Sequence, residues 1–252
     1  MTASNRISSW FTQTAGATVQ GLGHLLWPGV CPNCSQHIAE GGRGLCGECW
    51  EGLASVCSAD YCRRCGRDVS PYAVHDGTCP NCLGEHIRFD GIARAGVYAE
   101  SLRDMILAFK NDKTELDSVM TWLADSALQA GNFSKEIDLI VPVPLHWRRR
   151  LSRGYNQSYV LAERLKHPLS TDLVRIRYTP AQPTMPTMAA REKNVEGAFA
   201  VRYRHRFAGR RVCLVDDIKT TGATLNECAK TLKAAGASKV FALVLAVAGQ
   251  TV

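Results

Sequence analysis

From about residue 91 onward, the arrangement of apolar and polar residues changes repeatedly between two patterns that predict strands and helices in turn. Short apolar runs predict buried strands at residues 92–98, 137–143, 211–215 and 240–247. Apolar residues at three- and four-residue spacing predict helices at residues 102–109, 117–128, 157–165 and 224–235. Strands that alternate with helices are typical of a parallel α/β sheet flanked by helices.

The first ninety residues have few periodic apolar segments and fit a different kind of structure. Residues 5–30 carry apolar side chains at loose helical spacing, which predicts a helix that packs on the body of the protein. Residues 31–90 are rich in glycine and cysteine, and such a segment needs a staple to hold a fold. We therefore expect a helical segment at residues 1–30, a small cysteine-rich module at residues 31–90 and an α/β domain at residues 91–252.

The composition is that of an ordinary globular protein. Of the 252 residues, 46% are hydrophobic and 21% are charged, which argues against disorder for the body of the chain. The longest apolar runs, such as residues 240–248, are much shorter than the roughly 20 residues of a membrane-spanning helix. The N-terminal residues also lack the pattern of a secretory signal. The sequence therefore predicts a cytoplasmic protein without membrane insertion.

Charge is divided unevenly along the chain. Residues 1–90 hold 6 basic and 8 acidic residues, whereas residues 91–252 hold 24 basic and 15 acidic residues. The C-terminal part therefore favours anions, and phosphate groups, nucleic acid and solvent counter-ions all fit this preference.

Most of the cysteines are concentrated in a short part of the chain, where they form C-x-x-C pairs. One set has the spacing C-x2-C-x11-C-x2-C and consists of Cys31, Cys34, Cys46 and Cys49. The other has the spacing C-x2-C-x13-C-x2-C and consists of Cys62, Cys65, Cys79 and Cys82. Two residues between thiols let both sulfur atoms reach one tetrahedral ion, so structural zinc is favoured over redox-active thiols or an iron–sulfur cluster.

Sequential pairing of these cysteines gives two zinc sites, so residues 31–90 are expected to form a double zinc-ribbon-like module. A cross-braced arrangement or a single site is also compatible with the spacing. The remaining cysteines, Cys57, Cys213 and Cys228, are expected to be ordinary small apolar residues.

Residues 212–224, VCLVDDIKTTGAT, combine an apolar strand, a loop of small residues and the start of a helix. Open α/β sheets bind ligands at the carboxyl ends of their strands, where this loop is expected to lie. The unpaired N–H groups of the first helical turn attract an anion, and Gly222 lets the backbone approach it closely. Asp216 and Asp217 offer acceptors for two neighbouring hydroxyl groups. These features together predict a binding site for a ribose 5-phosphate.

Each of these features alone has a simpler interpretation, because a pair of aspartates often binds a metal or caps a helix. Together the thirteen residues resemble the phosphoribosyl pyrophosphate (PRPP) signature of type I phosphoribosyltransferases. The resemblance implies a type I phosphoribosyltransferase-like parallel sheet over residues 91–252 and Mg²⁺ bound with PRPP. It implies that Asp216 and Asp217 contact the ribose hydroxyls. The 5-phosphate would be held by Thr220, Thr221, Gly222, Ala223 and Thr224.

Lys219 occupies a position that varies in this motif and is expected only to add positive charge. Residues 138–144, DLIVPVP, predict a strand that runs into a turn bracketed by prolines, followed by a basic helix start. In the fold that the chain resembles this turn binds pyrophosphate, which implies roles for Val143, Pro144, Arg153 and Asn156. The neighbouring Arg148 and Arg149 fit a solvated surface better.

Residues 178–197 contain three prolines and little periodicity, which is typical of a functional flap or a mobile loop. Arg191 and Asn194 lie in this segment. Single basic residues are mostly surface charges. The family pattern nevertheless implies that Lys110 and Arg191 belong to a basic group that closes on pyrophosphate.

The order of the motifs resembles the ComF family from roughly residue 31 to the C-terminus. The C-x-x-C pairs are followed by F-K at residues 109–110, V-P-V-P at 141–144, R-G-Y-N-Q-S at 153–158, R-x-x-N at 191–194 and G-A-F at 197–199. This resemblance implies a zinc-bearing protein of phosphoribosyltransferase fold that takes part in DNA uptake and natural transformation. It also implies single-stranded DNA, and the helicase and recombination proteins of competence, as partners.

Two functions of different classes follow from the resemblance. The first is a PRPP-binding protein of DNA uptake whose basic surface contacts single-stranded DNA through Arg202, Arg204, Arg206, Arg210 and Arg211. The alternation in residues 201–207 fits an exposed strand edge slightly better than a DNA contact. The second is an active phosphoribosyltransferase that releases pyrophosphate from PRPP with an unknown acceptor. The sequence assigns no catalytic residue.

Overall fold

The computed structural model describes residues 29–38, 44–58, 60–75, 77–111, 114–147, 151, 154–179 and 187–249. The chain divides into two compact units, Met1–Trp50 and Glu51–Val252. Residues 1–28 of the helical segment predicted at residues 1–30 lie outside the described residues. Among the helices in these ranges, none has both the length and the apolar character that crossing a membrane requires.

The described part of the first unit is a small cysteine-bearing fold. Val30 forms an antiparallel bridge with His37, and the turn between them is closed by a bond of 2.7 Å from the Ser35 N–H to the Cys31 carbonyl. The helix α2, Gly47–Val56, begins in this unit. The bridge and the turn bring the first C-x-x-C pair into a tight knuckle.

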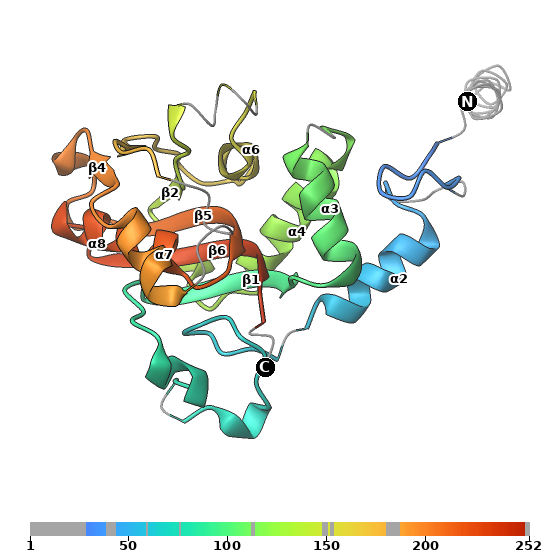
Figure 1. Cartoon of the computed structure of the whole chain (residues 1–252), viewed down its shortest axis with the longest axis horizontal. Helices are drawn as coiled ribbons and strands as arrows, with labels where there is room; N and C mark the ends of the chain where they lie inside the picture. The colour runs from blue at the N-terminus through green and yellow to red at the C-terminus, as the bar shows by residue number, and fades with distance from the viewer. Residues whose placement is uncertain are drawn as a thin grey trace, which may run out of the picture. The chain divides into compact units, whose positions relative to one another are not determined.

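The second unit is built on a four-stranded parallel sheet with the strand order β1-β6-β5-β2 (Figure 1). Its strands are β1 (Gly91–Val97), β2 (Leu139–Pro142), β5 (Arg211–Lys219) and β6 (Lys239–Val247). A second, antiparallel pair consists of β3 (Leu173–Arg175) and β4 (Phe199–Val201). The predicted parallel α/β sheet flanked by helices is confirmed.

Among the helices whose bounds lie within the described residues of this unit, five α-helices follow α2 and accompany the strands. They are α3 (Glu100–Lys110), α4 (Asp117–Gln129), α6 (Gln157–Glu163), α7 (Met188–Val195) and α8 (Ala223–Ala234). The short 3-10 helices are η1 (Pro71–Ala73), η2 (Pro80–Gly84), η3 (Thr114–Leu116), η4 (Ser134–Glu136) and η6 (Arg204–Arg206). Helix α4 packs on β1 and β6, α6 packs on β5 and β2, and α8 packs on β5 and β6 beside α7.

Successive side chains of β6 point to opposite faces of the sheet and pack against different structural elements on each face. Along β6, Val240, Ala242 and Val244 belong to the same buried cluster as the apolar face of α8. That face consists of Leu225, Cys228, Ala229 and Leu232, as its spacing predicts. On the other side, Phe241 stacks on Phe133 with ring centroids 4.2 Å apart. Because both faces are covered, β6 is almost entirely apolar.

Two segments differ from the sequence predictions. Strand β5 continues to Lys219, four residues beyond the predicted end, because Asp216 and Ile218 pair with Val244 and Ala246 of β6. Residues 187–195 of the predicted flap contain helix α7, which begins where the Thr187 hydroxyl accepts a bond of 3.1 Å from the Ala190 N–H. Residues 180–186 of that segment lie outside the described residues.

The prediction of an exposed strand edge at residues 201–207 is wrong. Strand β4 ends at Val201, and Arg204–Arg206 form η6 instead. Phe207 then turns into the core and is fully buried. The alternation of polar and apolar residues reflects a 3-10 turn here rather than a strand.

The second cysteine-rich segment packs directly against the sheet. The Ile92 N–H of β1 donates a bond of 2.9 Å to the Arg63 carbonyl. A Cβ atom added to Gly66 would lie 3.0 Å from Val247 and 3.2 Å from Ile92, so the knuckle touches the carboxyl end of β6. Phe89, at the end of the segment, is fully buried in the main core.

Candidate functional site

A short loop, residues 220–222, connects the carboxyl end of β5 to the first turn of α8, and we call it the phosphate loop after its predicted ligand. Gly222 lies immediately before α8 with φ at 79°, a left-handed conformation that other residues adopt only at a cost. Its carbonyl accepts a bond of 2.8 Å from the Asn226 N–H, which closes the first turn of the helix. The predicted 5-phosphate residues Thr220, Thr221, Ala223 and Thr224 therefore surround a helix N-terminus, where N–H groups and the helix dipole favour an anion.

The two adjacent carboxylates lie at the end of β5, where sheet pairing fixes their backbone. The Ser158 hydroxyl donates a bond of 3.0 Å to Asp216 Oδ1, and the Asp217 N–H donates another of 3.0 Å to the same oxygen. Lys110 Nζ lies 2.9 Å from Asp217 Oδ2. One cation and two neutral donors thus hold the two carboxyl groups in place.

Burial raises the pKa of Asp216 to about 7, and the negative charge of Asp217 adds to this effect. The Asp217 N–H, the Ser158 hydroxyl and the charge of Lys110 act in the opposite direction. The Asp216 carboxyl group therefore changes charge near neutral pH. Its ionised form accepts hydrogen bonds only, which suits it to sugar hydroxyls.

The residues expected at the pyrophosphate turn meet beside these carboxylates. The Val143 N–H donates a bond of 2.9 Å to the Val215 carbonyl, so the turn is joined to β5 directly before Asp216. The Asn156 side chain donates a bond of 3.1 Å to the Val143 carbonyl and accepts one of 3.2 Å from the Ser158 N–H. Asn156 therefore caps α6 and ties it to the turn. Pro144 follows Val143 in the same turn.

The structure brings together only some of the predicted basic residues. Lys110, at the end of α3, reaches the carboxylate pair through its contact with Asp217. Arg191 and Asn194 lie on α7, which packs on α8. Arg153, Arg148 and Arg149 lie outside the described residues.

The contacts of three residues at the site, Ser158, Lys219 and Glu85, were not predicted from the sequence. Ser158, the last residue of the R-G-Y-N-Q-S motif, bonds to Asp216. Lys219 is fully buried and lies 3.1 Å from Glu85, so it does not simply add positive charge to the loop. The signal for Ser158 was its place in the motif, whereas no local pattern connects Glu85 with a lysine 134 residues away.

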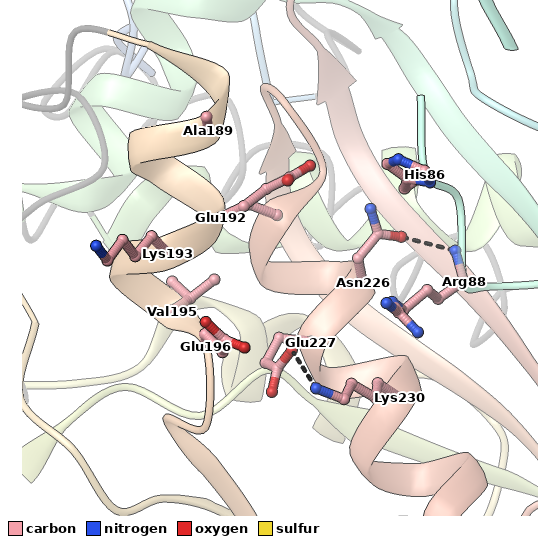
Figure 2. Close-up of a pocket in the computed structure, with 11 residues that line it drawn as sticks. His86, Arg88, Ala189, Glu192, Lys193, Val195, Glu196, Asn226, Glu227 and Lys230 are labelled. Carbon is pink, nitrogen blue, oxygen red and sulfur yellow. Dashed lines mark hydrogen bonds and ion pairs between the residues drawn. The ribbon is translucent and has the colours of Figure 1, made fainter. Parts of the chain in front are cut away.

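A groove of about 440 Å³ lies beside the phosphate loop, between α7, the first turns of α8 and residues 86–88 (Figure 2). Its lining combines acidic and basic side chains, namely Glu192, Glu196, Glu227, Lys193, Lys230, Arg88 and His86. Asn226 Oδ1 accepts a bond of 2.9 Å from the Arg88 N–H across the groove. The segment that leaves the second cysteine cluster thus contacts the helix that begins at the phosphate loop.

The eight paired cysteines form two groups of four, as sequential pairing predicts. In each group the sulfur atoms lie within 4.8 Å of one another, in the sets Cys31/Cys34/Cys46/Cys49 and Cys62/Cys65/Cys79/Cys82. The S···S distances include 3.4 Å between Cys34 and Cys46, 3.6 Å between Cys65 and Cys79, and 3.7 Å between Cys62 and Cys82. Zn–S bonds of about 2.3 Å in a tetrahedron place sulfur atoms about 3.8 Å apart. Both groups fit a structural zinc ion.

The unpaired cysteines behave as small apolar residues. Cys213 and Cys228 are fully buried, and burial raises the pKa of both thiols. Cys57 is half-buried, and burial also raises its pKa. None of the three thiols is therefore activated as a thiolate.

Comparisons with known proteins agree with this arrangement. Residues 22–83 match the double zinc ribbon domain, and residues 107–251 match the phosphoribosyl transferase domain. Competence protein F of Haemophilus influenzae is 32% identical over 220 residues, which are 83% of this chain and 93% of that protein. DNA utilization protein YhgH of Escherichia coli is 30% identical over 86% of this chain and 96% of its own length.

A more distant relative has the same character. Competence protein ComFC of Bacillus subtilis is 27% identical over 75% of this chain and 77% of that protein. The match to the phosphoribosyl transferase domain covers more than half of the chain, and the double zinc ribbon accounts for the cysteine-rich part. The chain belongs to the ComF family, as a homologue of competence protein F and DNA utilization protein YhgH that carries a double zinc ribbon followed in the sequence by a phosphoribosyl transferase domain.

Proposed function

We propose that this protein binds PRPP with Mg²⁺ at the carboxyl end of β5 and acts in DNA uptake. The observation that carries the proposal is the adjacency of two fixed carboxylates, Asp216 and Asp217, to a helix N-terminus opened by Gly222. The carboxylates accept hydrogen bonds from the 2- and 3-hydroxyls, and the N–H groups of the first α8 turn hold the 5-phosphate. The phosphoribosyl transferase domain and the names of the relatives support this function.

In this arrangement the pyrophosphate lies on the side of Val143, Pro144 and Lys110. The turn at Val143 is bonded to β5 directly before the carboxylates, and Lys110 already reaches them. Arg153 and Arg191 are proposed to add positive charge around the same group. Bound Mg²⁺ supplies further positive charge to the pyrophosphate oxygens.

Replacement of Gly222 tests the phosphate seat. A Cβ atom at Gly222 lies 3.1 Å from Lys219 Cε and strains a backbone with φ at 79°. We expect Gly222→Ala to weaken Mg²⁺–PRPP binding roughly thirtyfold, which corresponds to about 2 kcal/mol, because the loop amides move from the phosphate. Calorimetric titration of PRPP measures the change.

Gly209→Ala is the matched control for this titration. Gly209 has φ at 70°, and an added Cβ atom would meet nothing within 4 Å, so the backbone strain is similar but the position is remote from the loop. PRPP affinity within twofold of wild type is expected for Gly209→Ala. Equal affinity of the two variants, or no PRPP binding by the wild type, would reject the assignment.

Transfer of the ribosyl group extends the same proposal. Asp216 and Asp217 fix the ribose while a carbon–oxygen bond to the pyrophosphate breaks, and an acceptor replaces the pyrophosphate at that carbon. The acceptor class is not specified by the residues described above. Release of pyrophosphate that depends on an added acceptor distinguishes this enzyme from a PRPP-binding protein.

Single-stranded DNA is the second ligand that we propose, together with helicase and recombination proteins of competence as partners. The observation in favour is an exposed segment in which Tyr203, half-exposed, alternates with Arg202, Arg204 and Arg206. Aromatic rings stack on bases, and arginines contact the phosphate backbone. Arg204, however, bonds to the Ala234 carbonyl, and Arg206 and Arg211 form ion pairs with Asp172 and Asp138.

Neutralising Arg202 and Arg210 tests this surface without removing those three contacts. We expect Arg202→Gln/Arg210→Gln to weaken binding of a single-stranded oligonucleotide about tenfold and to lower its salt dependence by about two phosphate contacts. Fluorescence anisotropy at several salt concentrations measures both quantities. Asp216→Asn is expected to bind DNA like the wild type. Equal affinity and equal salt dependence in the wild type and in Arg202→Gln/Arg210→Gln would refute the surface.

We propose that the protein acts in the cytoplasm. Both tetracysteine groups consist of free thiols that must stay reduced to hold zinc. Cytosolic conditions keep such thiols reduced, whereas oxidising compartments convert them to disulfides.

A further inference from the structure

A buried ion network connects the second cysteine cluster to the phosphate loop. Lys219 Nζ lies 3.1 Å from Glu85 Oε2, and the two side chains are 0% and 5% exposed. Arg67, in the knuckle of the cluster, bonds to the other oxygen of Glu85 and is 11% exposed. Charges this deeply buried must be paired, because isolated ones lose far more solvation than the fold can replace.

Glu85 belongs to the cysteine cluster by its backbone as well. Its N–H donates a bond of 3.3 Å to the carbonyl of Cys82, the last cysteine of the group. The segment after it is held by Arg64, whose guanidinium bonds to the Ile87 carbonyl at 2.9 Å. Arg64 lies between Cys62 and Cys65. The position of Glu85 is therefore determined by both knuckles of the cluster.

The same short segment contacts both flanks of the phosphate loop. Glu85 pairs with Lys219, which directly precedes Thr220. Three residues later, the Arg88 N–H donates to the side chain of Asn226 in the first turn of α8 (Figure 2). The side chain of Lys219 in turn lies under Gly222, with Cε 3.1 Å from where a Cβ atom would be. Residues 85–88 thus contact the residue that directly precedes the phosphate loop and a residue in the helical turn that follows it.

We propose that the second cysteine cluster positions the phosphate loop, so that zinc in Cys62/Cys65/Cys79/Cys82 and a phosphate ligand at Gly222 stabilise each other's binding. Zinc fixes the two knuckles, the knuckles fix Glu85 and Arg88, and these residues fix the loop amides. Such coupling is reciprocal, and typical values lie between about 5-fold and 150-fold. The inference rests on the proposed PRPP site.

Lys219→Met is the variant that breaks this connection most selectively. Methionine retains much of the buried stem, and Glu85 keeps its ion pair with Arg67. Lys239→Met is the matched control, because Lys239 also pairs with a glutamate, at 3.1 Å from Glu136, but is exposed at the opposite end of the sheet. Asn226→Ala removes the second contact and serves if Lys219→Met does not fold.

The test uses the full chain loaded with two zinc ions and measures zinc transfer to a chromogenic chelator, with and without Mg²⁺–PRPP. We expect saturating PRPP to slow one phase of zinc release about tenfold in the wild type and in Lys239→Met, and less than twofold in Lys219→Met or Asn226→Ala. Because the coupling is reciprocal, PRPP affinity is expected to fall about tenfold in Lys219→Met and in Asn226→Ala, and to stay at the wild-type value in Lys239→Met.

The possible failures are distinguishable. If PRPP binds the wild type but slows no phase of zinc release, the coupling is refuted and the proposed function stands. The coupling is also refuted if Lys219→Met and Lys239→Met respond to PRPP in the same way. If PRPP does not bind the wild type, the proposed function fails and the inference fails with it.

Discussion

Replacing Cys65 with serine is expected to lower the melting temperature of the Glu51–Val252 unit by at least about 10 °C, which corresponds to more than about 3 kcal/mol in the free energy of unfolding. Cys65 is fully buried, and the other buried residues of the small cluster around it are cysteines, Cys62 and Cys79. Without the metal, residues 60–90 keep too little apolar contact to offset the entropy of ordering them.

Unfolding of residues 60–90 is also expected to destabilise the sheet. Gly66 packs on Val247 and Ile92, and the buried Glu85 would leave Lys219 without its partner. Breaking a buried ion pair on one side is strongly destabilising, by about 3–5 kcal/mol. Zinc content, circular dichroism melting and limited proteolysis of residues 60–90 measure the predicted effects together.

Cys34→Ser provides the control in the other cysteine cluster. It removes one ligand of the cluster in the Met1–Trp50 unit, so one zinc equivalent is expected to be lost there as well. The melting transition of the Glu51–Val252 unit is expected to stay within about 2 °C of wild type. A Cys65→Ser protein that keeps two zinc equivalents and the wild-type melting temperature would contradict the structural role of the second cluster.

Neutralising both carboxylates is expected to weaken Mg²⁺–PRPP binding at least about 100-fold. Asp216→Asn/Asp217→Asn removes two charged acceptors, and hydrogen bonds to charged groups contribute about 1.5–3 kcal/mol each. Titration calorimetry with wild type, the double variant and Asp104→Asn compares the affinities. Asp104 is exposed beside Arg103 on α3 and tests whether loss of any acidic charge has the same effect.

Asp216 makes stability and binding depend on pH in opposite directions. The pKa of Asp216 is raised from 3.8 to about 7 in the folded protein, so its contribution to stability is complete below about pH 4 and is lost as the pH rises through 7. PRPP binding, which uses the ionised form, is expected to strengthen over the same interval. Equal PRPP affinity at pH 6 and pH 8 would argue against this role of Asp216.

Asp216→Asn alone therefore separates the two effects. At pH 8 it is expected to raise the free energy of unfolding by about 2 kcal/mol, less than the full pKa change implies because the carboxyl is partly open to solvent. At pH 5 the difference from wild type is expected to be small, and thermal denaturation at the two pH values measures it. A wild-type affinity for PRPP in the double variant would refute the assignment of both carboxylates.

The parts of the fold that could be predicted are those whose pattern of apolar and polar residues lies within one short stretch of the sequence. Strand β6 is a continuous apolar run, and helix α8 repeats its apolar residues at three- and four-residue spacing, so the positions of both elements follow from residues close together in the chain. The carboxylates and the phosphate loop also form one continuous segment. Because a strand, a loop and a helix in this order place ligands at the end of a sheet, the candidate site could be located in advance.

The remaining features depend on partners that are distant in sequence. Aspartate disfavours strands, so the extension of β5 through Asp216 became visible only from its pairing with β6. Lys110 meets Asp217, and Ser158 meets Asp216, across separate elements. Helix α7 lacks strong periodicity and is defined by its Thr187 cap and its packing on α8. No pattern within a short window contains such information.

The separation of Glu85 and Lys219 by 134 residues also has a consequence for synthesis on the ribosome. At about 5–20 residues per second, Glu85 is made roughly 7–27 s before its lysine. Arg67, made earlier, is the cation that pairs with Glu85 during this interval. The zinc knuckle thus has its own counter-ion from the start, and Lys219 joins an acidic group that is already in place when the phosphate loop is translated.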